Sequence, residues 1–117
     1  MSEHDEQVAV VEWASWACHS IPELELLFAI PNGGHRHPAV ANKLKAEGVR
    51  SGLPDLMLPV PADPYFGLFI EMKTGKNRPS DTQNRWIKDL RKQGYRVEVC
   101  YGWEAARDVL LDYLSVG

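Results

Sequence analysis

The sequence has few cysteines, no long apolar run and no excess of positive charge. Its two cysteines, Cys18 and Cys100, match neither a disulfide framework nor a zinc-binding spacing, so we expect both to be reduced residues of a cytoplasmic protein. No apolar stretch approaches the length of a membrane span, and the acidic start Met-Ser-Glu-His-Asp-Glu lacks the pattern of a signal peptide. A disulfide scaffold and a membrane protein are therefore not expected.

Positive charge is scarce overall but concentrated in one region. The formal net charge of -3 argues against a purely electrostatic nucleic-acid binder. Residues 73–96 nevertheless hold eight Lys and Arg residues against two Asp residues. Such a division is expected when acids gather at a metal and bases line a phosphate backbone.

The pattern of apolar residues predicts one α/β domain over residues 1–117, because no repeat or linker interrupts it. Helices are predicted over residues 3–19, 39–47, 80–93 and 103–114, and strands over residues 24–30, 55–60, 67–74 and 96–101. Segments 55–60 and 67–74 are expected to form an antiparallel hairpin. That hairpin would bring Asp55, at the start of one strand, close to Glu71 and Lys73 near the end of the other.

Asp55, Glu71 and Lys73 are the candidate catalytic residues. Side chains two positions apart in a strand share a face, so Glu71 and Lys73 should project together while Leu68 and Ile70 point into a core. Charged groups on an apolar strand are costly to bury unpaired. Two carboxylates that hold a divalent cation, with Lys73 beside the attacking water or the phosphate, would account for all three. A structural ion pair would account for only two.

The basic residues supply candidates for DNA contacts, each with a plainer alternative. The loop over residues 75–79 is basic, and the predicted helix that follows carries a stripe of positive charge that is either a phosphate track or a solvated face. The turn after residue 30 is a solvated loop, a set of phosphate contacts or, as the last alternative, a His-x-His metal site. The candidates for DNA binding are Asn32, Arg36, Lys76, Arg78, Arg85 and Lys88.

A longer pattern surrounds the acids. It comprises Ile30-Pro31-Asn32-Gly33-Gly34, Leu44-Lys45-Ala46-Glu47-Gly48-Val49, Gly52-Leu53-Pro54-Asp55-Leu56, Glu71-Met72-Lys73-Thr74-Gly75, Gln83 with Trp86, and Gly94-Tyr95-Arg96-Val97. With the order of predicted elements, it resembles the virus-type replication-repair nuclease (VRR-NUC) domain of the PD-(D/E)xK superfamily. The resemblance spans nearly the whole chain and is to the stand-alone form of phages, without an accessory DNA-binding domain.

The resemblance implies a restriction-endonuclease-like core, a small mixed β-sheet flanked by helices, and a Mg²⁺- or Mn²⁺-dependent endonuclease acting on DNA in a bacterial host cell. It implies metal ligation by Asp55, Glu71 and the Met72 carbonyl, with Lys73 positioning the water. Gln83 matches the glutamine that the family places after the Glu-x-Lys strand, although Ser80-Asp81-Thr82-Gln83 also fits a helix capping box. For the acid that the family places on the first helix, Glu6 fits the buried face of that helix better, and Glu3 also fits the family spacing.

The resemblance also implies a substrate and an assembly. Similar stand-alone members are homodimers that cut branched DNA such as four-way (Holliday) junctions, and dimerisation would enlarge the binding surface of a small chain. Candidates for the dimer surface are Trp16, Tyr65, Phe66 and Trp103, each of which fits a core as well. A flap or single-strand nuclease, and a DNA-binding module without catalysis, are the alternatives. The two acids disfavour the last, since carboxylates repel phosphate unless a cation intervenes.

Overall fold

A four-stranded mixed sheet forms the centre of the molecule, in a computed structural model that describes residues 1–31 and 37–115. The strand order is β1-β2-β3-β4, with β1 and β2 antiparallel, β2 and β3 antiparallel, and β3 and β4 parallel. The predicted hairpin of β2 and β3 is confirmed. The bounds are Phe28–Ala29 for β1, Leu56–Leu58 for β2, Leu68–Lys73 for β3 and Arg96–Tyr101 for β4.

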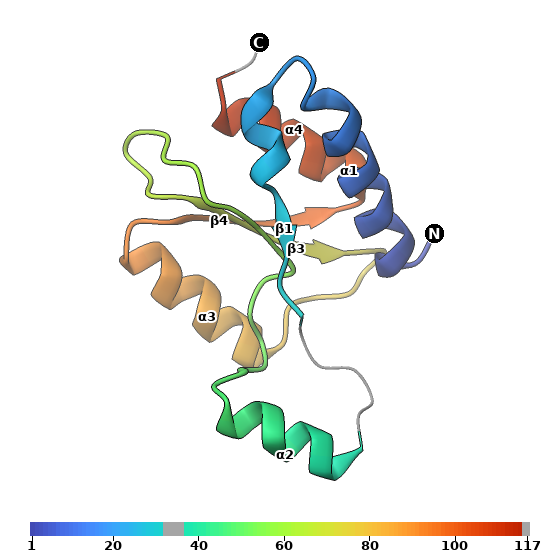
Figure 1. The fold of residues 1–117 in the computed structure, drawn as a ribbon, viewed down its shortest axis with the longest axis vertical. Coiled ribbons are helices and arrows are strands. Elements are labelled where there is room, and N and C mark those ends of the chain that lie inside the picture. The colour runs from blue at the N-terminus through green and yellow to red at the C-terminus, as the bar shows by residue number, and fades with distance from the viewer. Residues whose placement is uncertain (32–36, 116–117) are drawn as a thin grey trace.

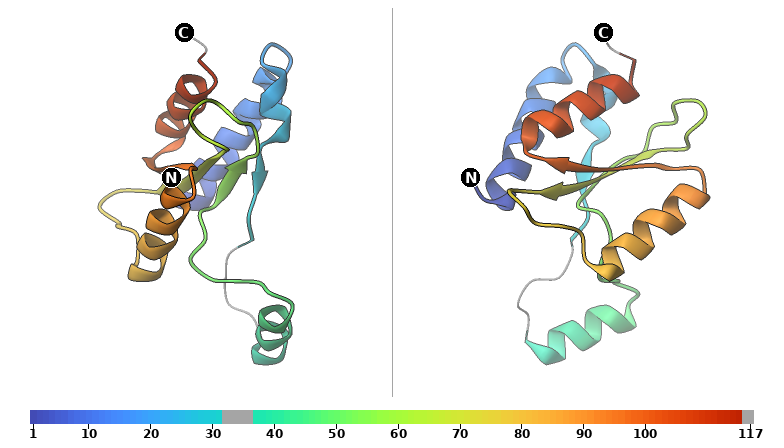
Figure 2. Two further views of the ribbon diagram at one scale, coloured as in Figure 1. Left: turned by 90° about the vertical axis from the view of Figure 1, so that its left-hand side faces the viewer. Right: turned by 180° about the vertical axis from the view of Figure 1, so that it is seen from behind.

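Helices lie on both sides of this sheet (Figures 1 and 2). Helices α1 and α4 cover one side, and α3 connects the parallel strands β3 and β4 on the other. Helix α2 stands apart at one end of the molecule and has no buried residue. The bounds are Glu3–Ala17 for α1, Pro38–Ala46 for α2, Asp81–Lys92 for α3 and Trp103–Tyr113 for α4.

The alternation of β3 creates two apolar clusters. Leu68, Ile70 and Met72 are at most 1% exposed and pack with α1 and α4. Phe69 points to the opposite side and packs with Ile87 of α3 and Val97 of β4. Glu71 follows Phe69 by two residues, so strand periodicity directs its carboxylate to the α3 side.

The predicted strand over residues 24–30 is largely wrong. Pro22–Leu26 forms a 3₁₀ helix, η1, and only Phe28–Ala29 is a strand. A short apolar run does not distinguish a buried strand from a helical turn by periodicity. Pro22 favours the first helical position, and Leu24 is the buried anchor of the turn.

The other predicted elements agree with the structure to within a few residues, and β4 has the predicted bounds. The strand predicted over residues 55–60 is shorter, because Pro59 has no N–H to donate to a neighbouring strand. The capping box of Ser80 and Gln83 is present, and both cysteines are free. Within residues 1–31 and 37–115, no helix combines the length and apolar character needed to cross a bilayer.

Candidate active site

Asp55 lies where three strands meet, one residue before β2. Its Oδ2 accepts a hydrogen bond of 2.7 Å from the backbone N–H of Met72 in β3, and its carbonyl accepts one of 2.8 Å from Ile30 after β1. The half-buried carboxyl is therefore fixed to the backbone of the strand that carries Glu71. The hairpin brings Asp55 to the Glu-x-Lys segment, as the sequence predicts.

Glu71 is the one charged residue among the described residues whose whole side chain lies in the core, with 2% of its surface exposed. Its Oε2 accepts a hydrogen bond of 2.9 Å from Gln83 Nε2 and lies 3.4 Å from the Nζ of Lys73. The side chain of Lys73 is itself only 11% exposed. A carboxylate and an ammonium therefore face each other in a largely water-excluded place, on the face that strand periodicity predicts.

Gln83 uses both ends of its amide. Its Oε1 accepts a hydrogen bond of 2.8 Å from Ser80 N–H, which completes the capping box at the start of α3. Its Nε2 donates to Glu71. The two interpretations of Gln83, as a helix cap and as a residue of the site, therefore describe the same side chain.

The electrostatics of this site favour protonated carboxyls. Burial is the main influence that raises the pKa of Glu71, to about 7; the negative charge of Asp55 raises it further, and Lys73 opposes both. Burial also raises the pKa of Asp55, against the hydrogen bond from the Met72 amide. Two carboxyls held together in this way carry an electrostatic strain that a cation would relieve.

The acidity of Glu71 predicts how the stability of the metal-free protein varies with pH. Its pKa is 4.5 ordinarily and about 7 in the fold, so the folded state holds this proton more tightly than the unfolded chain does. The resulting stabilisation is complete below pH 4.5 and is lost as the pH rises to about 7. We expect the free energy of unfolding to fall across this range by on the order of 3 kcal/mol.

Urea unfolding in EDTA at a series of pH values measures this change. Glu71→Gln has no proton to lose, so its stability should vary less over the same range. A wild-type protein and a Glu71→Gln variant with parallel curves would contradict the raised pKa.

The two acids of α1 lie in different surroundings. Glu3 accepts a hydrogen bond of 3.1 Å from Asn77 Nδ2, and its charge contributes to raising the pKa of Asp55 after the effect of burial. Glu6 instead accepts a hydrogen bond from the backbone N–H of Trp103, the first residue of α4. Helix α4 has Gly102 in its capping position, so Glu6 supplies the acceptor that this helix end lacks. The charge of Glu3 thus acts on Asp55, whereas Glu6 binds the start of α4.

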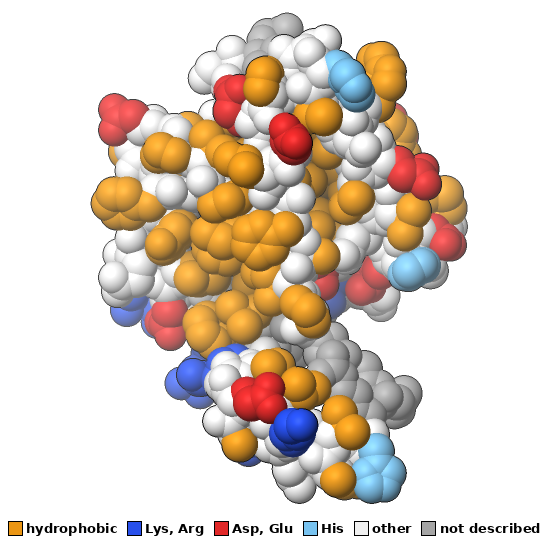
Figure 3. Space-filling view, viewed as in Figure 1, with side chains coloured by type: hydrophobic (Ala, Val, Ile, Leu, Met, Phe, Trp, Pro, Cys, Tyr) orange, Lys and Arg blue, Asp and Glu red, His pale blue; other side chains and the backbone are white. Residues whose placement is uncertain are grey.

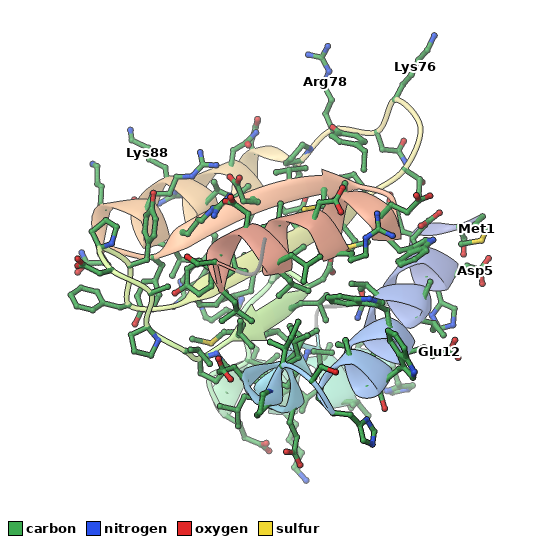
Figure 4. The ribbon with its side chains drawn as sticks, turned by 90° about the horizontal axis from the view of Figure 1, so that it is seen from above. Met1, Asp5, Glu12, Lys76, Arg78 and Lys88 are labelled. Atoms are coloured by element: carbon green, nitrogen blue, oxygen red, sulfur yellow. The ribbon has the colours of Figure 1, made fainter. Side chains whose placement is uncertain are left out.

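The exposed basic residues predicted to contact DNA follow Lys73 in the chain. Lys76 and Arg78 lie in the loop between β3 and α3, and Arg85 and Lys88 lie on α3. In Figure 4, Lys76, Arg78 and Lys88 point outward on one side of the molecule, away from Asp5 and Glu12 of α1. Asn32 and Arg36 lie outside the described residues.

Sequence reasoning missed Arg50, which lies in the segment between α2 and β2. Its guanidinium stacks over the ring of Trp86, 5.3 Å from the centroid, and the Trp86 indole N–H donates a hydrogen bond of 3.0 Å to the Ser51 carbonyl. The partners are some 35 positions apart, so no local pattern reveals them. The one feature of the sequence that could have indicated Arg50 is its positive charge close to the Gly52–Asp55 motif.

Comparison with known proteins identifies this arrangement. The mixed sheet with its Asp, Glu and Lys is that of a PD-(D/E)xK-type nuclease domain. The model of the VRR-NUC domain family matches residues 3–104, and the chain belongs to this nuclease family, as the sequence predicts. A solved structure, "VRR_NUC domain protein", is 26% identical with a TM-score of 0.76 over 100% of this chain and 91% of that one. No curated protein matches.

Proposed function

We propose that this VRR-NUC chain is a metal-dependent endonuclease that hydrolyses phosphodiester bonds of branched DNA such as four-way junctions. The observation that carries the proposal is the carboxyl pair Asp55 and Glu71, held beside Lys73 in a place with little water. A fold gains nothing by burying two acids side by side, where burial raises the pKa of both and the charge of Asp55 raises that of Glu71 further. A cation and a phosphate at this place would use both acids and the lysine.

The donor set fits a hard divalent cation. Within residues 1–31 and 37–115, no three His, Cys, Asp or Glu residues cluster as metal ligands, so the proposed site has two carboxylates, Asp55 and Glu71, and needs the Met72 carbonyl and water to complete it. Two carboxylates and a backbone carbonyl are oxygen ligands, which Mg²⁺ and Mn²⁺ prefer. Asp55, Glu71 and the Met72 carbonyl would hold the ion, which when bound lowers the pKa of water and neutralises charge on the phosphate.

The remaining residues would each act on the reacting groups or on a ligand. Lys73 would donate a hydrogen bond to the attacking water and then stabilise the negative charge that develops on the phosphate oxygens. Gln83 would hold Glu71 in the orientation that ligation requires. Of the acids on α1, Glu3 has the better position for a role at the site, and Glu6 remains the second candidate.

Basic side chains would hold the DNA around the reacting phosphate. Lys76, Arg78, Arg85 and Lys88 are exposed and face solvent, and Asn32 and Arg36 complete the set proposed from the sequence. Phosphate contacts of this kind position a duplex without reading its sequence. That suits an enzyme selecting the shape of its substrate.

A homodimer is proposed as the active assembly. Of the aromatic candidates, Trp16 and Phe66 are 75% and 66% exposed, whereas Trp103 packs against the core. Leu26, just before β1, and Phe28, in β1, are also exposed, and Figure 3 shows apolar side chains gathered on one face. Exposed apolar surface of this kind suits an interface between two copies.

Cleavage of a labelled DNA panel tests the proposed function. The panel contains a four-way junction, a flap, a duplex and a single strand, each with Mg²⁺, Mn²⁺ or EDTA, beside an Asp55→Ala control. We expect metal-dependent cutting of the junction that is lost in the control. If only the flap or the single strand is cut, the chain is a nuclease with that substrate. If the junction is bound but nothing is cut, the chain is a DNA-binding module without catalysis.

A further inference from the structure

A polar hollow of about 220 Å³ lies between the segment before β2 and the exposed side of α3. It has room for several waters, each of which occupies about 30 Å³ in the liquid. In Figure 3, basic side chains gather where α2 meets the rest of the molecule. The lining residues are Arg50, Ser51, Thr82, Arg85, Trp86 and Asp89.

Close packing holds the two walls of this hollow together. Besides the Trp86–Ser51 hydrogen bond, Gly52 lies directly against Thr82 of α3. A Cβ at position 52 would come within 2.5 Å of Thr82 Cγ2, and the φ of +87° is one that glycine adopts readily. The shape of the hollow is therefore set by backbone packing as well as by side chains.

Within residues 1–31 and 37–115, the two guanidiniums of the hollow have no acidic partner. Among the residues that the structure describes, neither Arg50 nor Arg85 forms an ion pair. Arg91, Arg96 and Arg107, by contrast, all pair with carboxylates. Among the described residues that line the hollow, Asp89 is the only acid, so two positive charges are set against one negative charge. Stacking on Trp86 orders the Arg50 side chain before any ligand binds.

The hollow is next to the candidate active site. Thr82 immediately precedes Gln83, which binds Glu71. Ser51 precedes Asp55 by four residues, a stretch of chain that spans at most about 13 Å. A DNA strand with one phosphate at Asp55 and Glu71 therefore has a neighbouring phosphate within reach of the hollow.

We propose that Arg50 and Arg85 form a binding subsite for a DNA backbone phosphate close to the one that is cut, with Trp86 as the positioning residue for Arg50. The proposal rests on the proposed nuclease function and extends it. The planar guanidinium forks suit the oxygens of a phosphodiester. Such a subsite fixes the register of the strand, so that the scissile phosphate is presented to Lys73.

Paired substitutions in protein and DNA test the subsite. Binding of a four-way junction in EDTA is measured for the wild type, Arg50→Ala and Arg85→Ala. It is measured again with junctions in which single phosphates are replaced by uncharged methylphosphonates. We expect each variant to bind about tenfold more weakly and to show a salt slope smaller by about 1. At one position, the methylphosphonate should weaken DNA binding by the wild type by a similar factor and leave binding by Arg50→Ala unchanged.

Arg107→Ala is the matched control. Arg107 also stacks on an indole, that of Trp103 at 5.1 Å, but it belongs to α4 on the other side of the sheet and pairs with Asp108. Thermal unfolding of each variant checks the fold. If Arg50→Ala and Arg85→Ala bind like Arg107→Ala, or if every methylphosphonate affects Arg50→Ala and the wild type equally, the subsite is overturned.

Cleavage separates the two proposals. If the wild type cuts the junction but Arg50 shows no coupling to any single phosphate, the proposed nuclease function stands and the proposed subsite is wrong. If the wild type cuts no DNA but Arg50 is coupled to one phosphate, the proposed subsite stands and the proposed nuclease function is wrong. A wild type that binds no DNA overturns both.

Discussion

Lys73→Ala is expected to reduce the rate of DNA cleavage by about 10²- to 10³-fold while the domain stays folded, because removal of a single well-placed donor has effects of this size. The ammonium is nearly buried and lies 3.4 Å from Glu71, so no solvent ion can take its place easily. Initial rates on a labelled junction at saturating metal measure the effect. Lys43→Ala, which removes an exposed lysine of α2 that has no proposed role, is the control.

The pH dependence of the Lys73→Ala variant separates two ways in which the lysine can act. Lys73 opposes the raised pKa of Glu71, so its removal should raise that pKa further. If Lys73 only keeps Glu71 ionised, cleavage by the variant should recover as the pH rises well above 7. Persistent loss at high pH is expected if the ammonium itself acts on the water or the phosphate. Near-normal rates at every pH would remove Lys73 from the mechanism.

Asp55→Asn is expected to abolish both cleavage and the stabilisation of the protein by metal. The amide oxygen can still accept the hydrogen bond from Met72 N–H, so the hairpin should keep its geometry. Only the charge that a cation needs is lost. In the wild type, an ion at a hundred times its Kd stabilises the folded state by about 2.7 kcal/mol. The midpoint of thermal unfolding would rise by several degrees.

Thermal unfolding with Mn²⁺, Mg²⁺ or EDTA measures the role of Asp55. The shift in the wild type should be larger at pH 8 than at pH 5.5, because protons compete with the metal for Asp55 and Glu71. Asp63→Asn changes an exposed loop residue and is the control. Metal should raise its unfolding midpoint as much as it does for the wild type. An Asp55→Asn protein with the same metal-induced shift would show that Asp55 is not a ligand.

Local patterns predicted the parts of the structure that depend on neighbours in sequence. The alternation of β4, the cap formed by Ser80 and Gln83, and the pairing of Glu71 with Lys73 all follow from spacings of two or three residues. The hairpin then placed Asp55 correctly, because an antiparallel register joins its ends in a defined way.

Features that depend on distant partners were not predictable in this way. The helical face of α1 predicted a half-buried Glu6, but not that its partner would be the first backbone N–H of α4, far along the chain. Arg50 acquires its position from Trp86 on another element. The apolar run at residues 24–27 was compatible with a strand or a helical turn, and only the packing of Leu24 selects the turn.

The two hydrogen bonds of the Gln83 amide couple the start of helix α3 to the position of Glu71. One end of the amide completes the first turn of α3 and the other steadies Glu71. When that turn frays, Ser80 and Glu71 lose their partner together, and the acid is left without its hydrogen bond. Until this end of α3 has formed, the Glu71 carboxyl therefore lacks the side chain that holds it in place.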